Sequence, residues 1–193
     1  GDASDVSDWN DFFNSPTGTP FTSVVVANNA VNLKGGSGLT LRDYVFGDND
    51  PTGTSLLEVV DTLGCIIACG DGVFSDYGSG NGCYALTKIH LPACIALGDE
   101  VFADCASLTD LVLPFASYTV LGNDVLTGCT SLLDSVVNQF VNLTSAGGSC
   151  FQFCTGLVSP DFSALLSAGD FCFAYCTGLV SPDFSALLSA GDF

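Results

Sequence analysis

Apolar and polar positions recur along this chain with a fixed period, and the period is clearest towards the C-terminus. Residues 150–171 and residues 172–193 are the same 22-residue unit written twice, with no linker between the copies. The copies differ at two positions only, Gln152/Ala174 and Phe153/Tyr175. A short fixed period is typical of a solenoid, in which each unit buries its apolar face against its neighbours.

The same pattern, Gly-Asp-x-x-Phe-x-x-Cys, extends backward through most of the chain. Its clearest copy spans residues 98–105, and an insertion at residues 77–82 delays Cys83 in the preceding copy. A degenerate first copy occupies residues 41–46. Further copies run over residues 122–129, 147–154 and 169–176. Successive cysteines of the pattern lie 22, 24, 25 and 22 residues apart, so the coils tolerate small loops.

Each copy predicts a turn followed by a short strand. Leu111 and Leu113 alternate about an outward Val112, which is the period of a strand in a segment too brief for a helix. The Gly-Asp segment predicts a tight turn in which Asp or Asn caps one helical or 3₁₀ turn that carries the Phe inward. We therefore expect a single core that contains Phe74, Phe102, Leu126, Phe151 and Phe173 in one column, and also Leu108, Leu111 and Leu113.

The segment from Phe102 to Pro114 carries the sequence pattern F-x-x-C-x-S-L-T-x-L-x-L-P. This pattern resembles the leucine-rich repeats of the BspA (Treponema) type, and the resemblance covers about residues 39–193 and is strongest over residues 83–132. It implies a leucine-rich-repeat solenoid, mainly β with short helical or 3₁₀ turns, about 22–25 residues per repeat and a parallel sheet along one face. Members of this family are mostly cell-surface or secreted proteins implicated in adhesion and matrix binding. The resemblance therefore also implies an extracellular or cell-surface location.

Two parts of the chain depart from the repeat. Residues 1–32 do not fit the period and predict an N-terminal cap, whereas residues 33–193 predict the solenoid, with about six coils of which the last is incomplete. Pro160 and Pro182 stand where earlier copies carry Ile or Leu. Because proline cannot donate to a sheet ladder, we expect the sheet to be interrupted beyond about residue 155.

The chain is strongly acidic, with 19 Asp and two Glu against two Lys and one Arg, and its net charge is −18. This charge repels nucleic acid phosphates and anionic lipid headgroups, so we expect neither as a partner. The apolar runs are far too short to span a bilayer, so no membrane insertion is expected. Carboxylate oxygens suit Ca²⁺, but aspartate is scattered along the whole chain, which favours a solvated surface. We expect no cofactor, with Ca²⁺ as the alternative.

Aspartate and asparagine share one position of the repeat. The column consists of Asp71, Asp99, Asn123, Asp170 and Asp192. Aligned carboxylates repel one another, so each needs a compensating contact. We expect each side chain to cap its own turn, because a cap satisfies backbone N–H groups that otherwise lack partners. Bound cations are the alternative, although the calcium loops of solenoids carry denser Gly and Asp than this sequence does.

The ten cysteines follow the repeat as well. Five of them share one position, namely Cys83, Cys105, Cys129, Cys154 and Cys176. This column favours buried free thiols, because packing accounts for the periodicity. Disulfides along the column, or between Cys150 and Cys172, are the alternative. The chain has one histidine, His90, and no Cys-x₂-Cys pair with histidine spacing, so no metal site is predicted.

The outward strand positions form the candidate protein-binding face. Its two columns are Glu58, Lys88, Asp110 and Asp134, and Val60, His90, Val112 and Val136. The face has no aromatic stripe and no basic track, so it predicts neither a carbohydrate platform nor an anion groove. His90 has no nucleophile oriented by a third group, so we expect no catalytic residue and a protein that is not an enzyme.

Two functions remain open at this point. The first is a structural or adhesive protein that stacks end to end into a fibre through an open apolar edge. This edge would consist of Phe184, Leu187, Leu188 and Phe193. The second is a monomeric adhesin that recognises a host or matrix protein through the sheet face. The two differ at the chain ends, because an independent module needs two polar caps and a fibre protomer needs an open apolar end.

Overall fold

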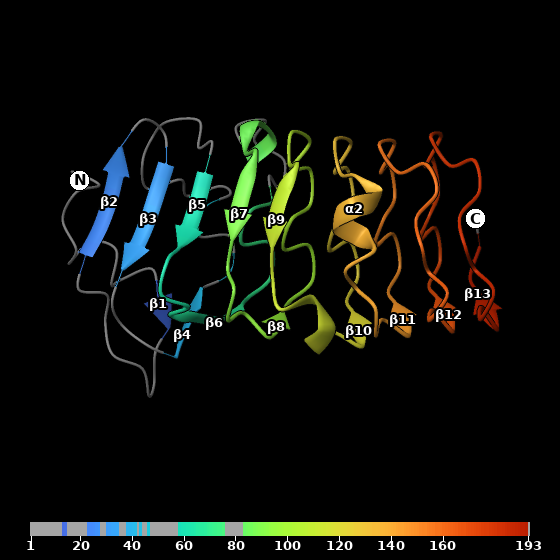
Figure 1. The fold of residues 1–193 in the computed structure, drawn as a ribbon, viewed down its shortest axis with the longest axis horizontal. Helices are drawn as coiled ribbons and strands as arrows, with labels where there is room; N and C mark the ends of the chain where they lie inside the picture. Colours follow the sequence, from blue (N-terminus) through green and yellow to red (C-terminus); the bar gives the residue numbers. More distant parts are fainter. Residues whose placement is uncertain are drawn as a thin grey trace.

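The predicted solenoid is confirmed. The computed structural model describes residues 13–14, 23–27, 30–34, 38–41, 43, 46, 58–75 and 83–192. Strands of successive coils lie side by side along the long axis of the molecule, from β2 at one end to β13 at the other (Figure 1). The hydrophobic core runs continuously through the middle of the stack, because each coil buries its apolar side chains against the coils before and after it.

One side of the solenoid is a five-stranded sheet, which we call the front sheet because it faces the viewer in Figure 1. Its strands, in spatial order, are β2 (Ser23–Ala27), β3 (Ala30–Lys34), β5 (Glu58–Asp61), β7 (Lys88–His90) and β9 (Asp110–Val112). The first pair is antiparallel and the others are parallel. Val59, Ile89 and Leu111 point into the core while their neighbours point outward, as the alternation predicts.

A second side also carries short strands, which lie along the lower edge in Figure 1. One sheet joins β1 (Phe13–Asn14), β4 (Leu39–Leu41), β6 (Ile66–Cys69) and β8 (Ala96–Leu97). The other joins β10 (Val120–Leu121), β11 (Ser145–Ala146), β12 (Ser167–Ala168) and β13 (Ser189–Ala190). All pairs here are parallel except β1 with β4. Parallel strands therefore line two sides of the coil, where the sequence led us to expect one.

In the part of the chain that the structure describes, short helices lie between several strands. The 3₁₀ helix η1 spans Cys83–Ala85, and η2 spans Phe115–Ser117, in the chain between β9 and β10. The α-helix α2 spans Asp134–Val137 and occupies the place of a front strand (Figure 1). The ring of Phe115 packs edge-on against Phe140 at 4.7 Å, so the extra turn adds to the core of its coil.

The front sheet ends one coil earlier than the prolines predict. The strand position of the next coil is helical, because the carbonyl of Leu133 accepts hydrogen bonds from the backbone N–H groups of Val136 and Val137. The following coils carry Pro160 and Pro182 at the strand position. On the front side of these coils, the structure has one isolated parallel bridge, between Asp161 and Asp183. The expected interruption beyond residue 155 is thus present, and it begins at α2.

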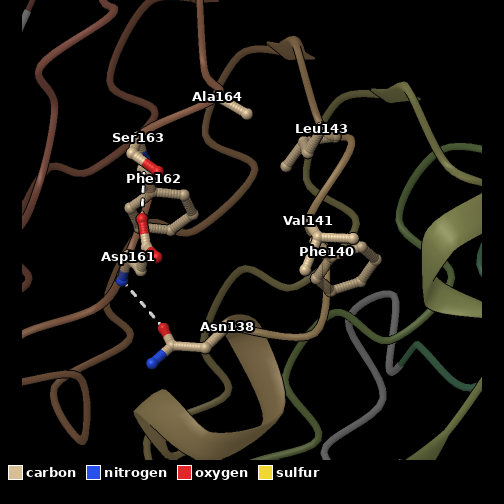
Figure 2. A pocket seen from close by; sticks show the side chains of 8 residues that line it. All are labelled: Asn138, Phe140, Val141, Leu143, Asp161, Phe162, Ser163 and Ala164. Atoms are coloured by element: carbon tan, nitrogen blue, oxygen red, sulfur yellow. Dashed lines mark hydrogen bonds between the residues drawn. The ribbon is translucent and has the colours of Figure 1, made fainter.

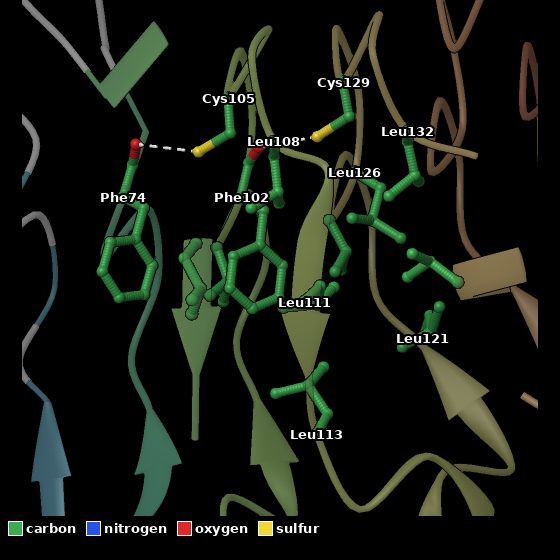
Figure 3. Close-up of a cluster of buried hydrophobic side chains, with 14 of the residues drawn as sticks. Phe74, Phe102, Cys105, Leu108, Leu111, Leu113, Leu121, Leu126, Cys129 and Leu132 are labelled. Carbon is green, nitrogen blue, oxygen red and sulfur yellow. Dashed lines mark hydrogen bonds between the residues drawn. The ribbon is translucent and has the colours of Figure 1, made fainter. Parts of the chain in front are cut away.

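The buried column predicted from the repeat is confirmed. Phe74, Phe102, Leu126 and Phe151 are at most 1% exposed, and Phe173 is 6% exposed. The Phe74 and Phe102 rings stack at 5.7 Å, and Leu126 continues the column in the next coil (Figure 3). Leu108, Leu111 and Leu113 line the same core, as expected. The register read from the sequence is therefore the register of the fold.

Candidate functional surfaces

The parallel register of the front sheet brings most of the predicted binding face together. Lys88 Nζ lies 3.9 Å from Glu58 Oε2, and His90 Nε2 lies 2.8 Å from Asp110 Oδ1. These polar groups on the outer surface thus pair with one another across neighbouring strands. Val112 is 36% exposed and lies in register with His90, so a row of acidic and basic side chains lies beside a row that contains His90 and Val112.

The last two residues of the predicted face, Asp134 and Val136, stabilise the fold and are not available for binding. Val136 belongs to α2 and is only 6% exposed, so it is not part of the outer surface. Asp134 accepts hydrogen bonds from the backbone N–H groups of Val158 and Ser159, both at 2.9 Å, one through each carboxylate oxygen. The sequence did not predict these roles, because the repeat pattern predicts a strand here with Asp134 and Val136 facing outward. The chain forms a helical turn instead.

A third side of each coil, which we call the Gly-Asp side, contains the Gly-Asp segments and connects the lower strands to the front. The expectation that each aspartate caps its own turn is wrong. Asp71 Oδ1 accepts a hydrogen bond from Asp99 N at 2.9 Å, and Asp99 Oδ1 accepts one from Asn123 N at 2.8 Å. Asn123 Oδ1 continues the ladder to the N–H of Gly148 at 2.9 Å. The side chains therefore link neighbouring coils, which a reading of one repeat at a time does not show.

The glycines that precede Asp99 and Asn123 allow the close approach on which this ladder depends. A Cβ added to Gly98 would lie 2.3 Å from Asp71 Oδ1 and 2.7 Å from the carbonyl oxygen of Gly70. A Cβ on Gly122 would lie 2.2 Å from Asp99 Oδ1. No side chain fits at such distances, so the glycine lets the carboxylate of the preceding coil approach its backbone.

Further carboxylates on the Gly-Asp side add negative charge next to the ladder. Burial, and then repulsion from Asp124 and neighbouring aspartates, raises the pKa of the Glu100 carboxyl. Burial, followed by repulsion from Asp99 and Asp104, raises the pKa of Asp124 in the same way. Within the described residues, no group of three or more His, Cys, Asp or Glu side chains is placed to hold a metal ion.

All ten cysteines are buried and unbridged. In the predicted column, each sulfur donates to the carbonyl of the core residue in the preceding coil: Cys129 Sγ to Phe102 O at 3.2 Å, Cys154 Sγ to Leu126 O at 3.2 Å and Cys176 Sγ to Phe151 O at 3.0 Å. Figure 3 shows two such contacts. Burial raises the pKa of four thiols in this column and so keeps them protonated and unreactive, namely those of Cys105, Cys129, Cys154 and Cys176.

A shallow pocket of about 90 Å³ opens beside α2 (Figure 2). It is lined by Asn138, Phe140, Val141, Leu143, Asp161, Phe162, Ser163 and Ala164. Asn138 Oδ1 accepts a hydrogen bond from Asp161 N, and Asp161 Oδ1 accepts one from Ser163 N. Hydrogen bonding to Ser163 lowers the pKa of Asp161, so this carboxylate is a poor general base. The pocket has room for a few water molecules and is smaller than a ligand site.

Two exposed aromatic side chains in the last two coils form a pair that the repeat pattern did not predict. Phe153 and Tyr175 stack at 4.7 Å with an angle of 6° between their rings, and they are 44% and 63% exposed. We call them the aromatic pair. Both have a left-handed backbone, with φ of 60° and 59°. Gly128 and Asp104 occupy the same position in earlier coils, so the aromatic side chains are peculiar to the last two coils.

The residues of the predicted end-to-end contact differ in how far they are exposed to solvent. Phe184 and Leu187 are partly buried and pack against the core, whereas Leu188 is 83% exposed. Phe193 lies outside the described residues. Phe184 stacks on Phe162 at 5.5 Å, which repeats the contact geometry of Phe173 on Phe151. No helix in the part of the chain that the structure describes has the length and apolarity needed to cross a bilayer.

Comparison with known proteins supports the fold and its repeat. The model of the BspA type leucine rich repeat region matches residues 78–189 in six copies. The curated proteins contain no match. A leucine-rich repeat protein from Bacteroides ovatus ATCC 8483 superposes with a TM-score of 0.56 at 22% identity, over 79% of this chain and 36% of that one.

A leucine rich cell surface protein from Faecalibacterium prausnitzii A2-165 gives a TM-score of 0.44 at 15% identity, over 88% of this chain and 55% of that one. The chain therefore spans about a third and about half of these two structures. At these identities the likeness to the first structure supports the solenoid fold.

Proposed function

Because the chain belongs to the BspA-type leucine-rich repeat family, we propose that it is a non-enzymatic protein of the cell surface or the extracellular space that binds a protein partner. The binding site is the aromatic pair on the Gly-Asp side of the last two coils. The observation that carries this proposal is the exposure of two stacked rings on a backbone that disfavours them.

The left-handed backbone at Phe153 and Tyr175 has a cost in folding free energy. A left-handed conformation costs a non-glycine residue about 1 kcal/mol or more, and glycine adopts it freely. Gly128 occupies this position one coil earlier, with φ of 70°. Glycine would therefore satisfy the fold at Phe153 and Tyr175, and the solvent-exposed rings gain little from burial. Large exposed aromatic side chains are typical of binding hot spots.

The surroundings of the aromatic pair indicate the chemistry of the partner. The same side of earlier coils carries Glu100, Asp104 and Asp124, and the raised pKa values of Glu100 and Asp124 reflect burial and repulsion between carboxylates. The whole chain has a net charge of −18. A partner with apolar side chains next to Lys or Arg would cover the rings and also relieve this repulsion.

We test the proposal with the double variant Phe153→Gly/Tyr175→Gly. Purified wild type and variant are passed over a panel of immobilised matrix proteins, and affinities are measured. We expect at least one matrix protein to bind the wild type and the variant to bind it at least about tenfold more weakly, which corresponds to the loss of one hot spot. Binding should also weaken as salt is raised, since part of the attraction is ionic.

Val120→Thr is the matched control, because Val120 is 61% exposed and lies in β10, away from the aromatic pair. It should bind as the wild type does. Thermal melts of both variants check that the fold is kept. Equal binding of the wild type and the double variant would place the site elsewhere, for example on the front sheet with Lys88 and His90. A panel without any binder would contradict the adhesive function.

End-to-end assembly into a fibre is a second candidate, favoured by the way identical units stack. Phe151 on Phe173 and Phe162 on Phe184 are parallel ring stacks of 5.4 and 5.5 Å, so one unit is complementary to another copy of itself. Leu188 is the exposed residue that such a contact would cover. Light scattering at increasing protein concentration tests this: growth that Leu188→Ser abolishes supports the fibre, and a stable monomer excludes it.

A further inference from the structure

Two cysteines outside the repeat column touch each other across neighbouring coils. Cys69 ends β6, and Cys94 lies two residues before β8, the strand that pairs with β6. The two sulfurs are 3.7 Å apart although the residues are 25 positions apart in the chain. Cys69 is 4% exposed and Cys94 is fully buried. The parallel pairing of the two strands thus holds two thiols in contact inside the core.

The direction of these sulfurs distinguishes them from the column thiols. Cys129 and Cys154 each direct their sulfur at a backbone carbonyl of the preceding coil, and this contact repeats along the column. The sulfurs of Cys69 and Cys94 contact each other, and Cys94 Sγ also donates to the carbonyl oxygen of Ala96 in its own coil at 3.3 Å. A disulfide requires converging side chains and a sulfur–sulfur distance of about 2.0 Å, and the contact supplies the convergence.

In the closed solenoid the two thiols of the pair have different surroundings. The hydrogen bond between the two thiols lowers the pKa of Cys94 and raises that of Cys69. The hydroxyl group of Tyr118 lies close by, donates to the backbone carbonyl of Cys94 and lowers the pKa of this thiol further. By contrast, burial raises the pKa of column thiols such as Cys105. In the closed solenoid Cys94 is therefore the more readily deprotonated thiol of the pair.

We propose that Cys69 and Cys94 form a disulfide that staples two neighbouring coils when the chain folds in an oxidising environment. The thiolate of one cysteine attacks the disulfide of an oxidant such as glutathione disulfide and releases one glutathione thiolate. The thiolate of the other cysteine then attacks the protein sulfur of this mixed disulfide and releases the second. One protein S–S bond replaces two S–H bonds, and the oxidant takes up two electrons and ends as two thiols after protonation.

Burial determines when this reaction occurs. Both sulfurs are enclosed in the folded solenoid, so the exchange takes place while the coils are still open during folding. Once the coils close, the bond is shielded from reductants. The pair thus stabilises the N-terminal half of the array by cross-linking two coils that otherwise separate independently in the unfolded chain.

Peptide mapping of the full chain decides the proposal. The protein is refolded in a buffer of reduced and oxidised glutathione, quenched with acid, alkylated in denaturant and digested. We expect a linked peptide that contains Cys69 and Cys94, with the column cysteines alkylated. Alkylation of both Cys69 and Cys94, or their linkage to other cysteines, would overturn the proposal. The test uses the glutathione buffer as oxidant, so its outcome is separate from that of the binding experiments.

Variants add a second measurement. Cys94→Ala should yield no linked peptide, and its melting temperature should not respond to dithiothreitol. Cys150→Ala is the matched control, since Cys150 is also fully buried. In this control and in the wild type, dithiothreitol added to the unfolded protein before refolding should lower the melting temperature by several degrees. A wild type whose melting temperature is the same with and without reduction would contradict the staple, and the peptide map stands on its own if Cys94→Ala fails to fold.

Discussion

At the scale of single residues, polar side chains connect coils where the backbone forms no regular strand. Asp71 and Asp99 accept backbone N–H groups of the following coil, and Cys129 donates its thiol proton to a carbonyl of the preceding one. Each coil of a solenoid contacts only its neighbours, so these contacts hold one unit to the next. A hydrogen bond between two coils cannot be seen in the sequence of one repeat. The Gly-Asp pattern therefore suggested that each aspartate caps its own turn.

The aspartate ladder predicts a difference between two substitutions of Asp99. Asp99→Ala removes the acceptor of the Asn123 N–H, and we expect a loss of about 1–2 kcal/mol in the free energy of unfolding. Asp99→Asn keeps an acceptor oxygen, as Asn123 does for Gly148 in the next step of the ladder. Urea unfolding measures both. An Asn variant as unstable as the Ala variant would show that the negative charge matters more than the hydrogen bond.

The close approach at Gly98 gives a second prediction. Gly98→Ala places a Cβ against Asp71 Oδ1 and the carbonyl of Gly70, and we expect a loss of about 1–3 kcal/mol from overpacking. Gly148→Ala is the matched control, because its Cβ would meet its nearest neighbour, the carbonyl oxygen of Asp170, at 3.4 Å. The control should change the stability little. Equal effects of the two variants would contradict the steric role of Gly98.

At the scale of elements, the alternation of apolar and polar residues predicted the strands of the front sheet. It did not predict the shorter strands of the second side or the helical turn α2. The inward positions of β7 and β9 followed from the pattern around Ile89 and Leu111, and the structure confirms them. The lower strands are mostly two residues long, too short for any period to show, as Ser167–Ala168 illustrates. A helical turn at Asp134–Val137 stands where a strand was expected, and its Asp134 carboxylate accepts a backbone N–H of the next coil.

The buried column that contains Phe102 allows a prediction of how much one inward side chain contributes to the free energy of unfolding. Phe102 is fully buried and stacks on Phe74, so Phe102→Ala should cost about 3–5 kcal/mol of unfolding free energy. Phe102→Leu should cost only about 1 kcal/mol, because Leu126 fills the same position one coil later. Denaturant titration followed by circular dichroism gives both values. Losses of similar size for Ala and Leu would mean that ring stacking, rather than buried volume, holds this column.

At the scale of the whole molecule, charge and exposure set the surfaces that remain for binding. The sequence identified the row of Glu58, Lys88 and Asp110, and the structure pairs Lys88 with Glu58 and Asp110 with His90. It did not identify Phe153 and Tyr175, because their exposure follows from a left-handed backbone that the winding of the coil imposes. The one available signal was that Phe153/Tyr175 is a position where two otherwise identical units differ and both stay aromatic.

The acidic Gly-Asp side makes the stability of the molecule depend on pH and salt. The raised pKa values of Glu100 and Asp124 mean that the folded state holds these protons more tightly than the unfolded state. Their favourable contribution is therefore complete below the unfolded pKa and is lost as the pH rises through the folded pKa. The variant Glu100→Gln/Asp124→Asn avoids this loss. At pH 7 and low salt we expect it to be more stable than the wild type by roughly 0.2–1 kcal/mol, the size of exposed charge interactions.

Urea unfolding at several values of pH checks this expectation. The advantage of the variant should shrink as the pH falls through the pKa range of the two carboxyls, and it should shrink at neutral pH when salt screens the repulsion. Asp161→Asn is the matched control, because hydrogen bonding to Ser163 lowers the pKa of Asp161, so this variant should gain no stability at pH 7. If the double variant is less stable than the wild type at pH 7 and low salt, Glu100 and Asp124 stabilise the fold as charges, and the negative potential that we assign to the partner-binding side is already balanced within the chain.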